Sequence, residues 1–138
     1  MYSVKINKKI APAILLLLAG VPLLTVAPVS AGKPVVTYSC TVSVQVTIGV
    51  FYVRTTITAT GGTLPSPELD FVSSYKNGVL YNTQSVTNDI PKQSTSFTFI
   101  VVVSTNGAGA YSFNSQVGRV NGHGQFTQLA FCYGNYNL

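Results

Sequence analysis

The chain has 138 residues, of which 8% are charged, and a formal net charge of +5 at pH 7. This length suits one domain. Three of the positive charges are Lys5, Lys8 and Lys9, which leaves residues 32–138 with a net charge of +2. The basic residues of that part are scattered singly, whereas nucleic-acid binding requires a concentrated basic face. We therefore expect no nucleic-acid partner.

The N-terminal segment has the order of a secretory signal peptide. The three lysines precede an apolar run at residues 10–24, and small residues then lead to Val29-Ser30-Ala31. A basic region, an apolar region and a small-residue cleavage site define such a signal. We expect a signal peptide at residues 1–31 and a mature domain at residues 32–138. The mature form would be secreted or held at the cell surface, with no stable membrane span.

Two alternatives for this segment stay open. A retained membrane anchor needs about 20 uninterrupted apolar residues, and Pro22 and Pro28 would interrupt its helix. The stretch K-K-I-A-P-A-I-L-L-L-L resembles the start of archaeal type IV pilins, in which a charged pair precedes an apolar helix. Lys9 and the prolines depart from that family's pattern of a small residue before the cleavage site and an unbroken helix after it.

The first element of the mature domain alternates between apolar and polar residues over positions 35–48. At a period of two, one set of residues lies on one face of a half-buried strand. The run exceeds the usual strand length of about 5 to 6 residues. It predicts two strands in series or one strand that overhangs its own domain. The apolar set is Val36, Tyr38, Cys40, Val42, Val44, Val46 and Ile48.

Further strands follow, separated by turn signals. Asn77-Gly78 is the strongest hairpin signal, because both turn positions require positive φ. Ile100 and Val102 make the strand at residues 96–104 apolar on both faces, which predicts cover on both sides. Residues 89–94 are expected to form a loop, and no helical periodicity follows residue 31. The expected strands span residues 51–60, 69–76, 79–81, 96–104, 110–120 and 126–133.

This series of short strands predicts a single antiparallel β-sandwich. The segments D-I-P-K-Q-S-T-S-F-T-F-I-V-V-V and A-Y-S-F-N-S-Q-V, with a turn between them, resemble immunoglobulin-like domains of prokaryotic surface proteins. In those domains a loop precedes a Thr/Phe/Val strand, and a strand containing Tyr and Phe returns beside it. The resemblance covers residues 41–120. It implies an immunoglobulin-like sandwich of about seven strands in a cell-surface protein, with no active site attached.

The two cysteines, Cys40 and Cys132, are expected to pair, because export places them in an oxidising compartment. Their bond would tie the first strand to the last. The face on which Cys132 lies stays open. In a regular strand Cys132 would point to the same side as Phe126, and Phe131 and Tyr133 would point to the other side, so apolar residues lie on both faces. Free thiols or an intermolecular bridge are the alternatives. The sequence has no C-x-x-C motif, which argues against a redox or metal role.

No motif in the sequence carries chemistry, so we expect no enzymatic activity, no cofactor and no metal. His123 is the single histidine, and its Gly-rich surroundings indicate an exposed turn residue more than a general base. Glu68 and Asp70 are interpreted as part of a solvated loop, because Ca²⁺ needs about 6 to 8 oxygen ligands. Tyr133 and Tyr136 are candidate contact residues, since Tyr and Asn suit adaptable interfaces; a frayed or core-capping tail is the alternative.

The sequence favours a secreted, non-enzymatic structural protein: a surface, matrix or filament subunit that assembles through strand edges. Val35 and Val36 precede Cys40, and a strand fixed at that cysteine leaves them free to add to a neighbour's open edge. The partner would be another copy or another extracellular protein. The alternative is a secreted binding module or inhibitor that uses a loop at residues 61–70. A pilin-like subunit and a small hydrolase using His123 are less favoured.

Secreted protein should begin at Gly32, because the small-residue site ends at Ala31. Intact-mass measurement of material from the culture medium checks this. A chain that begins at Ile10 would contradict the signal peptide and favour the pilin-like interpretation.

Overall fold

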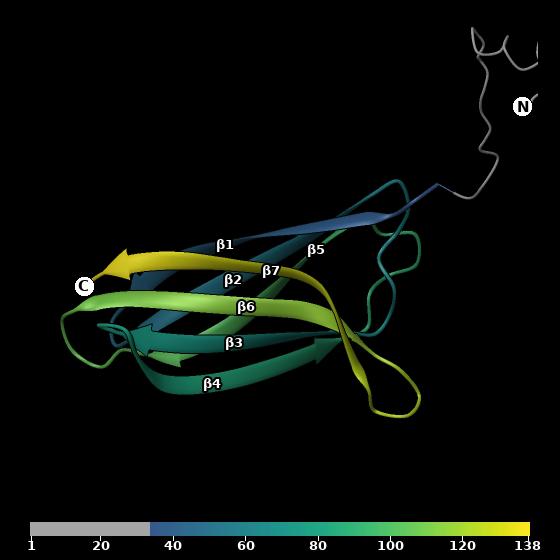
Figure 1. The fold of residues 1–138 in the computed structure, drawn as a ribbon. Helices are drawn as coiled ribbons and strands as arrows, with labels where there is room; N and C mark the ends of the chain where they lie inside the picture. The colour runs from purple at the N-terminus through teal and green to yellow at the C-terminus, as the bar shows by residue number, and fades with distance from the viewer. Residues whose placement is uncertain (1–33) are drawn as a thin grey trace, which may run out of the picture. The chain divides into compact units, whose positions relative to one another are not determined.

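The structure is a computed structural model that describes residues 34–138. Seven strands form two antiparallel sheets, with the orders β1-β2-β5 and β4-β3-β6-β7 (Figure 1). The predicted all-β, immunoglobulin-like sandwich is confirmed. The strands are β1 (Thr37–Thr47), β2 (Val50–Thr60), β3 (Glu68–Lys76), β4 (Val79–Asn88), β5 (Ser96–Ser104), β6 (Ala110–Val120) and β7 (Phe126–Asn137).

The predicted signal peptide, its cleavage site and the two alternative readings of the N-terminal segment lie outside the described residues. Within residues 34–138 there is no helix of the length and hydropathy that a membrane span requires.

The first strand pairs within its own domain. β1 runs antiparallel to β2 from Thr37 opposite Thr60 to Thr47 opposite Val50. Its alternation places the predicted apolar set inward except for Ile48, which is fully exposed. That placement of Ile48 was wrong, because the tight turn at Ile48 and Gly49, where Gly49 has φ +80°, takes the residue out of the strand.

The Asn77-Gly78 hairpin between β3 and β4 is confirmed. Both residues have positive φ, 50° and 82°, as a two-residue turn with this sequence requires. β4 and β7 continue well past the predicted ends at Tyr81 and Tyr133. Their polar ends pair with β3 and β6, and this ladder, rather than hydrophobic alternation, holds them in strands.

The core consists of two apolar clusters separated by buried polar residues. Thr55 lies between the two clusters on β2, and Ser115 does so on β6; both are fully buried, as is Asp70 on β3. We call Thr55, Asp70 and Ser115 the polar layer. The first cluster is Phe51, Val53, Val72, Val101, Val103, Tyr111 and Phe113, and the second is Ile57, Ala59, Leu64, Ile90, Phe99, Val117 and Ala130.

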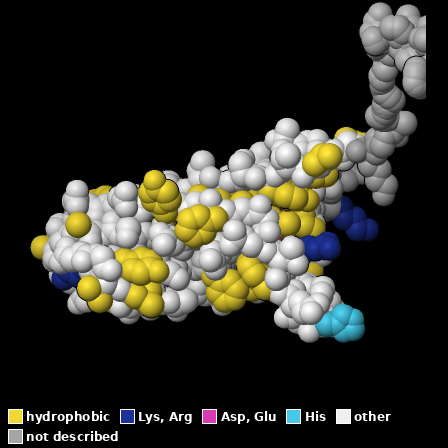
Figure 2. Space-filling model, in the orientation of Figure 1, with side chains coloured by type: hydrophobic (Ala, Val, Ile, Leu, Met, Phe, Trp, Pro, Cys, Tyr) yellow, Lys and Arg dark blue, Asp and Glu magenta, His cyan; other side chains and the backbone are white. Residues whose placement is uncertain are grey.

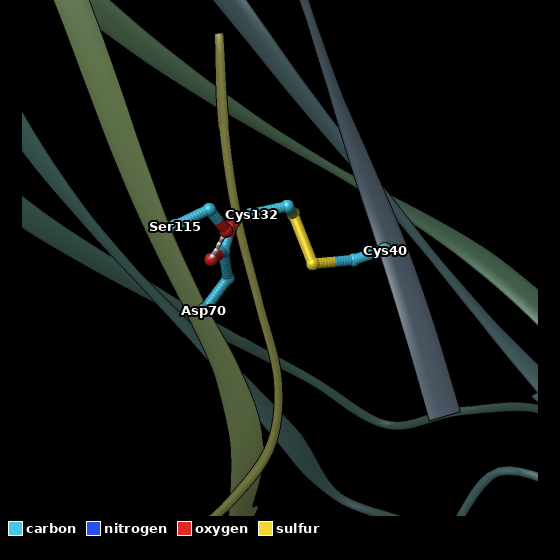
Figure 3. Close-up of a disulfide and its surroundings, with 4 residues drawn as sticks. All are labelled: Cys40, Asp70, Ser115 and Cys132. Atoms are coloured by element: carbon cyan, nitrogen blue, oxygen red, sulfur yellow. Dashed lines mark hydrogen bonds between the residues drawn. A yellow bond between two sulfur atoms is a disulfide. The ribbon is translucent and has the colours of Figure 1, made fainter. Parts of the chain in front are cut away.

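A disulfide closes one side of the sandwich. Cys40 of β1 is bonded to Cys132 of β7, with the Cα atoms 5.8 Å apart (Figure 3). These strands are edges of different sheets. Gly134 lets them approach, because a Cβ atom there would lie 2.8 Å from Cγ1 of Val42. The bond therefore links the two layers at an edge where no backbone ladder does.

A β-bulge decides the facing of Cys132. The register between β6 and β7 shifts at Val117/Gly118, leaving Leu129 without a partner. A bulge inserts one extra residue, so the inward–outward alternation of side chains shifts by one position across it. Phe126 therefore lies on the outer face, whereas Cys132 points toward β1.

Replacing both cysteines by alanine should lower the free energy of unfolding by up to about 4 to 5 kcal/mol, the chain-entropy value for a long loop; the cysteines are 92 residues apart. Urea denaturation of both proteins measures the difference. Alkylation of folded, unreduced protein provides the control, and labelling of both thiols would contradict the disulfide.

Candidate functional site

The side of the sandwich away from the disulfide is open. β4 and β5 are the edge strands there, and no described strand joins them. A groove of about 270 Å³ lies between them, lined by Tyr81, Asn82 and Gln84 on one side and residues 103–106 on the other. The Tyr81 hydroxyl donates a hydrogen bond to the Ser104 carbonyl across the groove, at 3.2 Å.

The outer edge of β5 is apolar and uncharged. The strand S-F-T-F-I-V-V-V-S contains no proline and no charged residue. Val101 and Val103 are buried, but Ile100 and Val102 are 50% and 45% exposed. The prediction that β5 is covered on both faces was wrong, because no described element covers the outer face of its sheet.

Exposed apolar residues continue at the start of β4. Val79 and Leu80 are 68% and 52% exposed, and they directly precede the groove residue Tyr81. An unpaired strand edge with apolar side chains around it can bind an extended polypeptide, with main-chain hydrogen bonds supplying affinity and side-chain pockets supplying specificity.

The two predicted assembly residues, Val35 and Val36, differ in burial. Val35 is 81% exposed, whereas Val36 packs against the second core cluster. Gly62 makes room for Val36, since a Cβ atom there would lie 2.5 Å from its Cγ2. Of the two, Val35 is therefore the residue that extends from the domain.

The predicted contact residues lie on opposite faces of β7. Tyr133 is 65% exposed on the outer face. Tyr136 packs against the first core cluster, with its ring centroid 5.7 Å from that of Phe51. The structure does not bring the two tyrosines together into one site.

Glu68 and Asp70 are buried, so their interpretation as a solvated loop was wrong. Both lie on β3 with no exposed surface. The Ser115 hydroxyl donates to Oδ1 of Asp70 (Figure 3), and the Thr55 hydroxyl approaches this carboxyl without completing a hydrogen bond. Both carboxyl oxygens of Glu68 and Oδ2 of Asp70 have no hydrogen-bond partner among the described residues.

Burial perturbs both acids. It raises the pKa of Glu68 to about 7 from an ordinary value of 4.5, because a charged carboxylate is poorly solvated in the core. Burial also raises the pKa of Asp70, and the hydroxyls of Ser115 and Thr55 oppose that rise. The strand itself was predicted over residues 69–76, so Asp70 already lay within it. The error concerned its buried face, since the residues that point inward include Asp70 and Ser74. Glu68 lies one residue before the predicted strand.

The remaining candidates for catalysis or metal binding are not part of a site with Glu68 and Asp70. His123 is exposed in the turn between β6 and β7, where its backbone N–H donates to Oδ1 of Asn121 at 2.8 Å. Residues 34–138 contain no group of three or more His, Cys, Asp and Glu side chains arranged to hold a metal ion.

Comparison with known proteins assigns no family. No protein-family model and no curated protein matches the chain. The CARDB domain of PF1109 from Pyrococcus furiosus is similar in its solution structure, with 14% identity, a TM-score of 0.44 and coverage of 74% of this chain and 94% of that chain. The crystal structure of the same domain in complex with di-metal ions is 13% identical, with a TM-score of 0.45 and coverage of 78% of this chain and 96% of that chain. A beta-glucosidase from Kluyveromyces marxianus is 13% identical, with a TM-score of 0.42; the similarity covers 74% of this chain and 14% of that chain. These similarities assign no function to this chain.

The domain should lose stability as the pH rises from about 4.5 to about 7, the unfolded and folded pKa values of Glu68. Below this window both states bind the proton. Above it the native state carries a buried charge, which costs at most roughly 3 kcal/mol. Glu68→Gln should flatten this dependence and stabilise the domain at pH 8, as measured by urea denaturation across the pH range.

Asp89→Asn is the matched control, because Asp89 is an exposed acid. Its pH profile should follow that of the unmodified protein. A Glu68→Gln profile with the unmodified slope would contradict the role of Glu68.

Proposed function

We propose that the mature domain is a secreted, non-enzymatic structural protein, a subunit of a surface, matrix or filament assembly in which copies join through strand edges. The bare edge of β5 carries this proposal. The disulfide suits an oxidising, extracellular setting, and the sequence resemblance to prokaryotic surface domains points to the same location.

The composition of β5 favours a partner strand. Soluble proteins usually protect an edge strand with lysine, proline, a bulge or very short length. β5 has nine residues and neither lysine nor proline, and its pairing with β2 is regular. A strand added at this edge would satisfy its free N–H and C=O groups and place side chains beside Ile100 and Val102.

Residues 32–35 of a second copy are the proposed donor. Val35 is exposed and lies just before the residue that anchors the chain, Val36. Pro34 cannot donate a hydrogen bond, so it suits the end of an added strand. Val35 would supply the apolar anchor, and a fully buried valine contributes about 1.5 to 3 kcal/mol.

Donor and acceptor belong to opposite edges of the first sheet. Val35 leads into the edge strand β1, and its carbonyl lies close to Gly61. The acceptor is the free edge of β5, the other edge strand of that sheet. A contact between two different surfaces is heterologous, and it repeats head to tail where it does not close into a ring.

Removing residues 32–35 from the secreted protein, or introducing Ile100→Lys with Val102→Lys, should abolish self-association and leave a folded monomer. The deletion removes the donor, and the lysines place charges on the acceptor edge. Sedimentation velocity measures assembly, and circular dichroism checks the fold.

Thr41→Lys with Ser43→Lys is the matched control, because these residues are exposed on the outer face of β1, the other edge of the same sheet. This variant should assemble normally. An unmodified protein that is monomeric at all concentrations, or a deletion that lowers the melting temperature while oligomers persist, would overturn the proposal.

A further inference from the structure

The outer face of the second sheet carries aromatic and amide side chains without charge. The residues that point outward on this face follow from the pairing registers of β3, β4, β6 and β7. In Figure 2, which views this face, hydrophobic side chains lie in separate patches among polar ones, and Lys and Arg appear toward the ends. The outward residues include Leu69, Phe71, Ser73, Tyr75, Thr83, Ser85, Thr87, Ser112, Asn114, Gln116, Phe126, Gln128, Phe131, Tyr133 and Asn135.

β3 presents its more apolar face to solvent. Leu69, Phe71 and Tyr75 point outward, while Asp70 and Ser74 are buried. Burial of apolar area alone would favour the opposite orientation. The aromatic side chains of this strand therefore lie where a ligand can reach them, and the polar ones occupy the core.

The rings flank a central pair of amides on β6. Gln116 lies opposite Phe71 on one side and Phe131 on the other, and Asn114 lies opposite Tyr133. Adjacent strands are about 4.8 Å apart, so Phe71 and Phe131 are separated by roughly 10 Å. Phe131 and Tyr133 are 50% and 65% exposed.

At one end of this face, a glycine leaves the space that an aromatic ring occupies. Gly118 is buried, and a Cβ atom there would lie 2.7 Å from Cζ of Phe126. The Phe126 ring packs over this position and meets the Phe71 ring edge-on, with centroids 5.3 Å apart. We call the outward rings of Phe71, Phe126, Phe131 and Tyr133 the aromatic platform. The position of its Phe126 ring depends on the absence of a side chain at residue 118.

We propose that this face binds a neutral polysaccharide. Aromatic rings offer apolar surfaces with fixed geometry for the C–H faces of sugar rings, and the amides and hydroxyls between them can hydrogen-bond to sugar hydroxyls. Because the outward positions carry no charge, they do not suit nucleic acids or acidic glycans, which need basic groups. This site is separate from the β5 edge and does not depend on the assembly proposed above.

Affinity gel electrophoresis of the secreted protein tests this inference, with hydroxyethylcellulose, galactomannan, amylopectin and dextran as neutral probes and dextran sulfate as the charged comparison. At least one neutral probe should retard the protein, and dextran sulfate should not. Phe131→Ala with Tyr133→Ala should weaken the retardation by about tenfold or more.

Tyr52→Ala is the matched control, since Tyr52 lies on the outer face of the other sheet; it should bind as the unmodified protein does. Ile100→Lys with Val102→Lys should also bind, which separates this test from that of assembly. No retardation by any neutral probe overturns the inference, as does retardation that survives loss of both rings. Self-association that disappears with Phe131 and Tyr133 would instead make this face a contact between copies, and would overturn it too.

Discussion

The bond between Cys40 and Cys132 decides which side of this sandwich is closed. It joins an edge strand of one sheet to an edge strand of the other, so β1 and β7 cannot part to admit another strand. The remaining edges, β4 and β5, have no such tie among the described residues. The domain therefore has one covalently fixed side and one open side, and the exposed apolar residues Ile100, Val102, Val79 and Leu80 lie on the strands of the open side.

The same bond lies beside the least favourable part of the core. Cys132 pairs across the ladder with Ser115, whose hydroxyl donates to Asp70. The chain-entropy gain of a long-loop disulfide, at most about 4 to 5 kcal/mol, is of the same order as the roughly 3 kcal/mol at most that an ionised Glu68 costs. The bond therefore offsets part of the cost of placing carboxyl groups in the core.

Local sequence predicted the strands well because alternation and turn residues are local signals. It failed where a neighbour decides the outcome. The facing of Cys132 depends on the bulge at Leu129, and the cover of Ile100 depends on which elements lie over β5. Glu68 and Asp70 were misplaced because alternation shows that two faces differ, whereas the inward face is set by packing against the other sheet. The groove lies between β4 and β5, which are consecutive in the chain but belong to different sheets, so the alternation within either strand does not reveal it.

The two proposed surfaces are compatible in space. The β5 edge belongs to the first sheet, and the aromatic platform is the outer face of the second. Strand addition at β5 extends the first sheet sideways and leaves the outer face of the second sheet uncovered. A head-to-tail assembly would then repeat the same polysaccharide-binding face once per subunit. Repetition raises the effective concentration of every site after the first contact, so even a weak single face would hold such an assembly firmly on a long neutral polymer.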